Sequence, residues 1–285
     1  MSNGTPGPLE LRPVPGPGAL GGGWRRFWDL LYLMAVNEFK KAYFETVLGY
    51  FWSLLRPLML FGVLLVVFTQ IFRIGDGLQE NYAVFLLLNI VLFTFFQEAT
   101  TVATTSVVAQ EGIVRKTQFP RLVIPMAAVL TGIFNLGTNM VAVVIFAIAF
   151  GVLPMITWLL FPVVLVVLIV MASAVATLLS ALYVRRRDVA IIWSVVSTAL
   201  FYGSAVLYPI AAVSNETLVH IMFVNPLVPL FVQTNKWLID SGAPGAAEAA
   251  GGWEYLIPSV IVSLSICVLS VWFFAKEAPR VAEEL

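Results

Sequence analysis

Charge is scarce in this sequence of 285 residues: only 11% are Asp, Glu, Lys or Arg, whereas 60% are hydrophobic. A water-soluble domain usually carries about 25% charged residues, because its surface must be hydrated. The 16 cationic and 16 acidic side chains give a net charge of zero, so the composition offers no basis for binding nucleic acid. The composition therefore predicts a protein whose solvent is the lipid bilayer.

The residue types that carry most enzyme chemistry are also rare. There is one histidine, His220, and one cysteine, Cys267, so neither a Cys/His zinc site nor an intramolecular disulfide is expected. No lysine follows a glycine, which excludes the phosphate-binding loop of P-loop ATPases. All aspartates lie outside the apolar runs, so they offer no carboxylate pair for glycosyl transfer. We expect no catalytic residue, metal or cofactor in this chain, and any ATP and Mg²⁺ would be bound by a partner.

Six apolar runs are long enough to cross a bilayer, which takes about 20 predominantly apolar residues. They cover residues 57–72 with the preceding Leu54 and Leu55, 82–108, 123–153, 155–184, 189–208 and 255–275. Only a tight turn at Pro154 separates the third run from the fourth. The sequence thus predicts an all-α polytopic membrane protein with six transmembrane helices in a unit of residues 51–285.

Cationic residues gather in alternate loops of this topology. If the N-terminus is cytoplasmic, every Lys and Arg lies on the cytoplasmic side except Arg73 and Lys236. Cationic loops are retained in the cytoplasm, and an even number of spans places both termini on one side. Both termini are therefore predicted to be cytoplasmic, in a bacterial inner membrane.

Three segments are predicted not to span. Residues 1–23 are rich in proline and glycine without an apolar core, which predicts a disordered tail. Residues 24–50 have the make-up of an amphipathic helix that lies in the cytoplasmic interface and turns inward near Gly49. Residues 209–241 are too broken by proline to cross and too apolar for an aqueous loop, which favours two short re-entrant helices on the outer side. The apolar face of the amphipathic helix comprises Trp24, Phe27, Leu31 and Met34.

Glu98 is the one carboxylate inside a predicted span, about halfway along the second run. A charge at mid-bilayer costs about 3 kcal/mol or more unless it is paired or faces water, which marks Glu98 as a functional candidate. No cation within a predicted span is available as its partner. The alternative is a structural role, in which Glu98 hydrogen-bonds polar groups such as Asn135 or Asn139.

Two aromatic stripes at helical spacing are candidates for lining a substrate path. Aromatic rings offer flat apolar faces, which suit contact with sugars that lack charge. Aromatic stripes in membrane helices also serve as packing or interfacial belts, and periodicity alone does not separate these roles. The stripe residues are Phe61, Phe68 and Phe72 on the first run and Trp193, Phe201 and Tyr208 on the fifth.

The stretch from Leu48 to Pro57, Leu-Gly-Tyr-Phe-Trp-Ser-Leu-Leu-Arg-Pro, resembles the beginning of the permease of type-2 ABC polysaccharide exporters, the Wzm-like family. That family handles O-antigen, capsule, teichoic acid and related polymers. The resemblance covers about residues 25–285. Further motifs recur in the same order: Ile113-Val114-Arg115-Lys116, Phe119-Pro120-Arg121 with Pro125, Arg187-Asp188-Val189, Tyr208-Pro209-Ile210, Asn225-Pro226-Leu227 and Ala282-Glu283-Glu284-Leu285.

This resemblance implies a homodimeric permease bound to two copies of a separate nucleotide-binding ATPase. The substrate would be a polyprenyl-linked polysaccharide, and the pore would lie between the first and fifth spans. Residues 110–121 would form a coupling helix in a cleft of the ATPase, and 209–241 would form external gate helices. An apolar knob with a charged rim suits such a contact. The knob includes Ile113 and Phe119, and the rim comprises Glu111, Arg115, Lys116 and Arg121.

The substrate is less well defined than the topology. The abundance of Ala, Val, Gly and Pro is typical of actinobacterial proteins and favours a galactan-type cell-wall precursor. A type-2 ABC exporter of a drug or small lipid would share the topology and the ATPase. A membrane glycosyl- or acyltransferase would use the same lipid-linked substrates, and a proton-coupled flippase would depend on Glu98.

Overall fold

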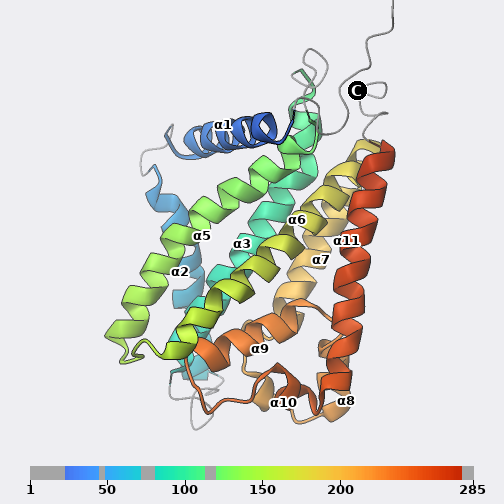
Figure 1. The fold of residues 1–285 in the computed structure, drawn as a ribbon. Coiled ribbons are helices and arrows are strands. Elements are labelled where there is room, and N and C mark those ends of the chain that lie inside the picture. The colour runs from blue at the N-terminus through green and yellow to red at the C-terminus, as the bar shows by residue number, and fades with distance from the viewer. Residues whose placement is uncertain (1–22, 45–48, 72–80, 113–119, 278–285) are drawn as a thin grey trace, which may run out of the picture.

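The computed structural model describes residues 23–44, 49–71, 81–112 and 120–277. The described residues are mainly helical and form no strand. Long helices run side by side, α1 lies across one end of them, and a layer of short helices covers the other end (Figure 1). The long helices are α2 (Phe51–Val66, continued by a π-helical turn, Val67–Ile71), α3 (Tyr82–Ala109), α5 (Val123–Ala149), α6 (Phe161–Arg185), α7 (Val189–Gly203) and α11 (Ile257–Glu277).

Helix α3 is the centre of the bundle. In its most apolar stretch 78% of the residues are buried, compared with 11% in the corresponding stretches of α2 and α11. It packs against α2, α5, α6 and α7. A helix that is apolar on all sides is expected in such a buried position. The hydroxyls of Thr100 and Thr104 each donate to a carbonyl one turn earlier, at 2.7 Å, so these polar groups do not need partners outside the helix.

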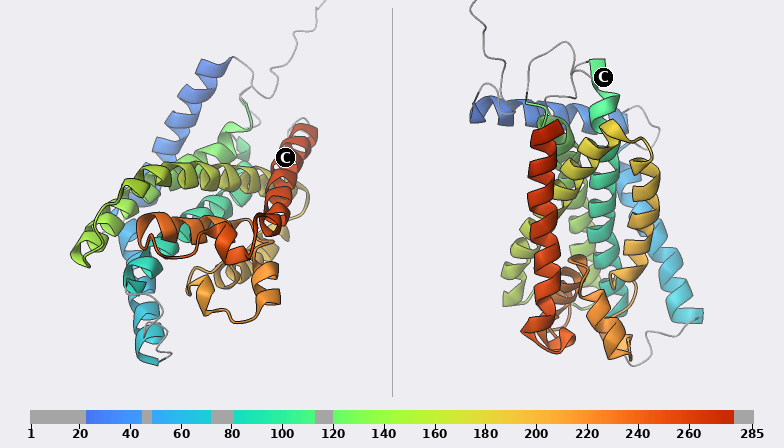
Figure 2. Two further views of the ribbon diagram at one scale, coloured as in Figure 1. Left: turned by 60° about the horizontal axis from the view of Figure 1, so that its bottom comes forward. Right: turned by 90° about the vertical axis from the view of Figure 1, so that its right-hand side faces the viewer.

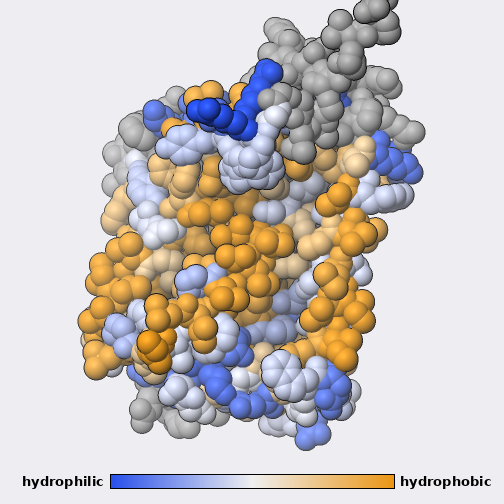
Figure 3. Space-filling view, viewed as in Figure 1, coloured by the Kyte–Doolittle hydropathy of each residue, from blue (hydrophilic) through white to orange (hydrophobic). Residues whose placement is uncertain are grey.

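In the part of the chain that the structure describes, five helical segments are long and apolar enough to cross a bilayer. They are α2 with its π-helical turn, α3, α5, α6 with the preceding 3-10 turn (Ile156–Leu160), and α11 with the preceding 3-10 turn (Trp253–Leu256). Apolar side chains form a broad band over the long helices, and polar residues gather towards both ends of the molecule (Figure 3). The class predicted from the sequence, an all-α polytopic membrane protein, is confirmed.

The fifth predicted span differs from its prediction of residues 189–208, because α7 ends at Gly203. Its 15 residues reach about 22 Å, short of the roughly 30 Å of a bilayer core. The next residues, Ser204 to Leu207, are buried without being helical. Asn225 Nδ2 donates to Ser204 Oγ at 2.7 Å, and the Tyr82 hydroxyl donates to the carbonyl of Leu207 at 2.6 Å. Side-chain partners of this kind allow irregular backbone to lie inside a membrane protein.

The turn between α5 and α6 begins earlier than the predicted turn at Pro154. Gly151 adopts a left-handed backbone (φ 83°), which suits glycine because it has no Cβ. Its N–H donates to the carbonyl of Ile148 at 3.1 Å, and the N–H of Val152 donates to that of Ala147 at 2.9 Å. These two bonds form a Schellman motif, which ends α5 at Ala149.

Helix α1 (Trp24–Phe44) lies across the ends of the long helices (Figure 2). Phe27, Leu31 and Ala35 are buried against α5, so the predicted apolar face packs on protein, but Trp24 is 67% exposed. Gly49 has a left-handed φ of 50° immediately before α2, where the inward turn was predicted. The position of α1 in a membrane interface stays a prediction, and the predicted tail lies almost wholly outside the described residues.

The opposite end is covered by α8 (Glu216–Met222), α9 (Leu227–Leu238) and α10 (Ala246–Ala250), with a 3-10 turn at Ile210–Ala212. Helices α8 and α9 meet at 103° around Asn225-Pro226, so the two short helices predicted within residues 209–241 are present. Their depth in a bilayer stays a prediction. Helix α10 was not predicted.

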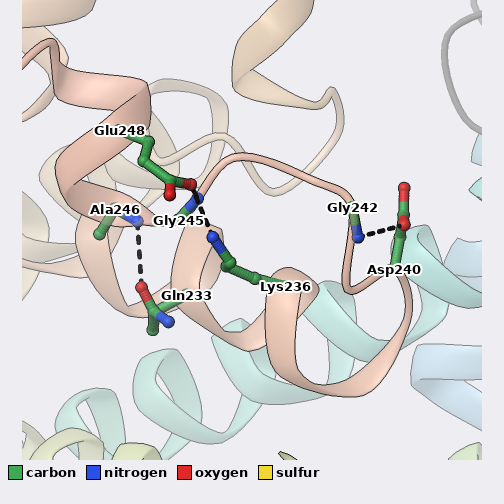
Figure 4. A network of polar contacts seen from close by, with 7 residues as sticks. All are labelled: Gln233, Lys236, Asp240, Gly242, Gly245, Ala246 and Glu248. Atoms are coloured by element: carbon green, nitrogen blue, oxygen red, sulfur yellow. Dashed lines mark hydrogen bonds and ion pairs between the residues drawn. The ribbon is translucent and has the colours of Figure 1, made fainter.

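A small polar network fixes α10 onto α9 (Figure 4). Lys236 Nζ donates to Glu248 Oε2 at 2.6 Å, and the backbone N–H of Gly245 donates to the same oxygen at 2.7 Å. The N–H of Ala246 donates to Gln233 Oε1 at 3.0 Å. The hydrogen bond from Lys236, followed by that from Gly245, lowers the pKa of the Glu248 carboxyl below its usual value.

The lowered pKa of Glu248 predicts that α10 loosens in acid. The ionised carboxylate stabilises α10 fully above the usual glutamate pKa of about 4.3, and this stabilisation is lost as pH falls through the lower folded-state pKa. Amide-exchange protection factors of residues 245–250 should therefore fall between neutral pH and about pH 3. Glu248→Gln should show the lower protection already at neutral pH and little further response. Equal pH responses in the wild type and the variant would contradict the stabilisation of α10 by the ionised Glu248 carboxylate.

Candidate functional site

Three polar contacts join the beginning of α2, together with Tyr50 just before it, to α3 and α5. Tyr50, Ser53 and Arg56 are spaced by three residues and so share one side of this segment. The Tyr50 hydroxyl donates to the carbonyl of Phe134 at 3.3 Å and is also hydrogen-bonded to Thr138 Oγ1. We call the following three contacts the α2 clamp: Tyr50 with Thr138, Ser53 with Asn139, and Arg56 with Glu98.

The contact between Ser53 and Asn139 follows from a proline inside α2. Pro57 has no N–H, so the carbonyl of Ser53, four residues earlier, loses its ordinary helical donor. Asn139 Nδ2 donates to that carbonyl at 3.3 Å, and also to the carbonyl of Asn135 at 2.9 Å. A buried carbonyl without a donor costs about 1–3 kcal/mol. Asn139 therefore supplies from α5 the hydrogen bond that Pro57 removes from α2.

The third contact corrects the expectation that Glu98 has no cationic partner within a span. Arg56 Nη1 lies 3.2 Å from Glu98 Oε1. The apolar run that predicted the first span begins at Pro57 and so left Arg56 among the cytoplasmic cations, but α2 begins at Phe51 and carries Arg56 in its second turn. The side chain of Glu98 is 32% exposed and that of Arg56 is 77% exposed, so this is a partly open pair rather than a sealed one. Asn139, which the structural alternative paired with Glu98, donates to the carbonyl of Ser53 and so links α5 to α2.

A cavity of about 680 Å³ opens beside the α2 clamp, between α1, α2, α3 and α5. Its walls carry both charged and neutral polar groups, unlike the groove of about 300 Å³ between α5 and α6, whose lining is almost wholly apolar. Glu98 and Asn135, two of the intramembrane polar residues singled out in the sequence, both face this cavity. Its polar walls include Glu38, Lys41, Arg56, Glu98, Gln110 and Asn135, with Trp52 beside them.

The aromatic stripe of α7 packs inward against α3. Trp193 is 8% exposed, and its Nε1 donates to Thr100 Oγ1 at 3.1 Å. Gln97 Nε2 donates to Ser197 Oγ at 3.2 Å, and the rings of Phe201 and Phe93 lie 5.2 Å apart. The opposite side of α7 is the exposed one, with Ile191, Ile192 and Val195. Within one chain these stripe residues therefore pack in the core, and a pore-lining role for them stays a prediction.

The remaining stripe residues are also engaged within the chain. Phe61 is 7% exposed and packs edge-on against Phe146, with the ring centroids 5.2 Å apart. Phe68 packs partly buried against the main core, and the Tyr208 hydroxyl donates to the carbonyl of Tyr202 at 3.0 Å. Phe72 lies outside the described residues. Their contact with a substrate stays a prediction as well.

Most of the predicted coupling segment lies outside the described residues, including Ile113, Arg115, Lys116 and Phe119. Glu111 follows α3, and Arg121 lies just before α5. Gln110 Nε2 donates to Glu38 Oε1 at 3.3 Å, so the beginning of this segment contacts α1. The beginning of the predicted coupling segment therefore lies at the α1 end of the bundle.

No group of three His, Cys, Asp or Glu side chains in the described part of the chain is arranged to hold a metal ion. Cys267 is a free, partly buried thiol of α11. His220 stacks on Tyr255 with the ring centroids 3.9 Å apart and the planes 3° from parallel. The sequence placed His220 in the outer segment but did not identify this ring partner.

The apolar band and the long helices define a polytopic membrane protein. Residues 29–233 match the ABC-2 type transporter family, and the chain belongs to that family. The match begins within α1 and ends within α9.

The chain is similar over most of its length to curated proteins of that kind. It is 25% identical over 224 residues to the O-antigen export system permease protein RfbA of Myxococcus xanthus, which covers 78% of this chain and 84% of the relative. It is 24% identical over 259 residues to two proteins of Klebsiella pneumoniae with the same name, covering 90% of this chain and 95% of each relative.

Proposed function

We propose that this protein is the permease subunit of an ATP-driven exporter that moves a polyprenyl-linked polysaccharide from the cytoplasm across the inner membrane. The observation that carries this proposal is the similarity, over most of the chain, to permeases named for O-antigen export. The substrate would be a cell-envelope glycan, of O-antigen or galactan type. The permease itself makes and breaks no bonds.

The proposed orientation places both termini in the cytoplasm. The described cations of α1, Arg25, Arg26, Lys40 and Lys41, lie at the α1 end, and Lys236 lies in the opposite layer. This asymmetry is the one that retains cationic segments in the cytoplasm. The α1 end would then face the ATPase, and α8, α9 and α10 would face outward.

The proposed complex is a homodimer of this chain with two ATPase subunits. Residues 110–121 and α1 would contact the ATPase, so ATP binding and hydrolysis would move these two elements. Described contacts link them to the rest of the bundle: Gln110 joins α3 to α1, and the α2 clamp joins α2 to α3 and α5. Motion at the α1 end would thereby reach the helices proposed to line the substrate path.

Depletion of this protein in its native host tests the proposal. Polyprenyl-linked glycan of normal composition should accumulate on the cytoplasmic side of the inner membrane, because synthesis continues while export stops. Extraction of the lipid-linked glycan, with protection from an externally added glycosidase, measures both composition and side. Re-expression of the intact chain should restore surface glycan.

Two of the alternative functions, export of a drug or small lipid and transfer of a glycosyl or acyl group, predict different outcomes of the same depletion. A drug or small-lipid exporter would leave the amount and position of lipid-linked glycan unchanged. A membrane glycosyl- or acyltransferase would cause accumulation of a glycan that lacks the transferred group. Either result would contradict export of a finished polymer by this chain.

A further inference from the structure

The cavity beside the α2 clamp carries equal numbers of positive and negative side chains. Arg56 lies 3.2 Å from Glu98, and Lys41 lies 3.6 Å from Glu38. A phosphate in this cavity would be attracted by the two cations and repelled by the two carboxylates. A neutral ligand with several hydroxyl groups meets no such conflict, because each hydroxyl both donates and accepts.

The same walls offer hydrogen-bonding groups that the described contacts do not exhaust. The Oε1 atom of Gln110 is buried and has no hydrogen-bond partner among the described residues, while its Nε2 donates to Glu38. A guanidinium carries five N–H donors, and Nη1 of Arg56 makes one contact, with Glu98, at 3.2 Å. Buried acceptors without partners are rare in folded proteins, so Gln110 points to a missing donor.

An aromatic ring stands beside these polar groups. Trp52 lies one helical turn before Arg56, lines the cavity and is 47% exposed. The flat face of an indole packs well against the C–H face of a sugar ring, while the hydroxyls at the ring edge reach polar partners. The cavity volume of about 680 Å³ lies within the range of roughly 300–1,000 Å³ for small-molecule sites.

The outer surface of α2 continues from this cavity as an apolar surface. Met59, Val63 and Val66 are each more than half exposed on the helix that carries Trp52 and Arg56. A lipid chain attached to a ligand in the cavity could therefore extend along α2 within the bilayer. A free sugar would gain nothing from this surface.

We propose that the cavity between α1, α2, α3 and α5 binds an uncharged sugar unit of a lipid-linked glycan, stacked on Trp52 and hydrogen-bonded by Arg56, Glu98 and Gln110. The identity of the ligand rests on the proposed function, whereas the site rests on the side chains that line the cavity.

Binding of small matched probes to the full-length protein in nanodiscs tests this site. The probes are butyl glucoside, butyl galactoside and butyl phosphate, which share one alkyl chain and differ in the head group. Saturation-transfer NMR should detect at least one glycoside and should show no comparable signal from the phosphate. Trp52→Ala should weaken glycoside binding roughly tenfold, because the stacking surface is lost.

Two further variants separate the site from the fold. Thr105→Leu fills the cavity from α3 and should also abolish glycoside binding, whereas Trp272→Ala, an exposed tryptophan of α11 outside the cavity, should leave it unchanged. Binding of the phosphate in preference to the glycosides would overturn the proposal, as would the absence of all binding or equal binding by wild type and both cavity variants.

The test of this binding site and the test of the proposed function can fail independently of each other. Glycan export without glycoside binding would remove this site and leave the function intact. Glycoside binding that follows the predicted pattern, in a protein whose depletion leaves glycan export unchanged, would keep the site and remove the function.

Discussion

Glycan export should fall at least about tenfold when Ile113 and Phe119 are both replaced by serine. In the proposed complex these two side chains are the apolar knob that enters a cleft of the ATPase, and buried apolar anchors carry most of the binding energy at such contacts. The lipid-facing helices are untouched, so the variant should insert and fold as the wild type does. Export from inverted vesicles that contain the ATPase and lipid-linked glycan is the measurement, with co-purification of the ATPase as a second readout.

The matched control changes two polar neighbours of the same segment, Thr117→Ser and Gln118→Ser. This variant should export normally and retain the ATPase. Wild-type export by the Ile113/Phe119 variant, or by a chain that lacks residues 110–121, would show that the ATPase is coupled through another surface.

Asn139→Leu should lower the free energy of unfolding by about 1–3 kcal/mol, because the Ser53 carbonyl that Pro57 deprives of its helical donor then has no replacement. Pro57→Ala restores an N–H at position 57, and in that background Asn139→Leu should cost under about 1 kcal/mol. The measurement is equilibrium unfolding in mixed micelles for the four proteins of this double-mutant cycle.

Asn89→Leu is the matched control, because Asn89 is fully buried in α3 and neither atom of its amide has a hydrogen-bond partner among the described residues. Replacing an unpartnered buried amide by leucine should leave the stability unchanged or raise it. Equal losses from Asn139→Leu with and without Pro57 would contradict the role assigned to Asn139.

Much of the fold could be predicted from the sequence, because hydrophobic length is a strong signal in a membrane protein. The broken segment after α7 could also be located, since Asn225-Pro226 interrupts the helix there. The length of α7 could not be predicted, because residues 204–207 continue the apolar character of the run. Tertiary contacts of Tyr82 and Asn225 keep these residues out of the helix.

The polar contacts inside the bundle were harder to predict. Glu98 could be singled out as an intramembrane carboxylate, but its partner Arg56 could not, because Arg56 precedes the continuous apolar run that begins at Pro57. Residue spacing gave no sign that Gln97 would meet Ser197. One signal was available: Pro57 frees the carbonyl of Ser53, which requires a polar group on a neighbouring helix.

The aromatic stripes show the limit of periodicity. Trp193 and Phe201 share one face of α7, and that face contacts α3 within the chain, whereas Tyr208 lies beyond the end of the helix. Helical spacing shows that certain residues share one face of a helix, but it does not show which neighbouring helix that face contacts.

Purified vesicles with defined components test the central claim most directly. Three preparations are compared, with this chain alone, with the ATPase alone, and with both, each supplied with lipid-linked glycan and ATP. Delivery of chemically unchanged glycan across the bilayer should occur only when both proteins are present. Nucleotide hydrolysis or a bond change in the glycan lipid by this chain alone would contradict a permease that is driven from outside its own polypeptide.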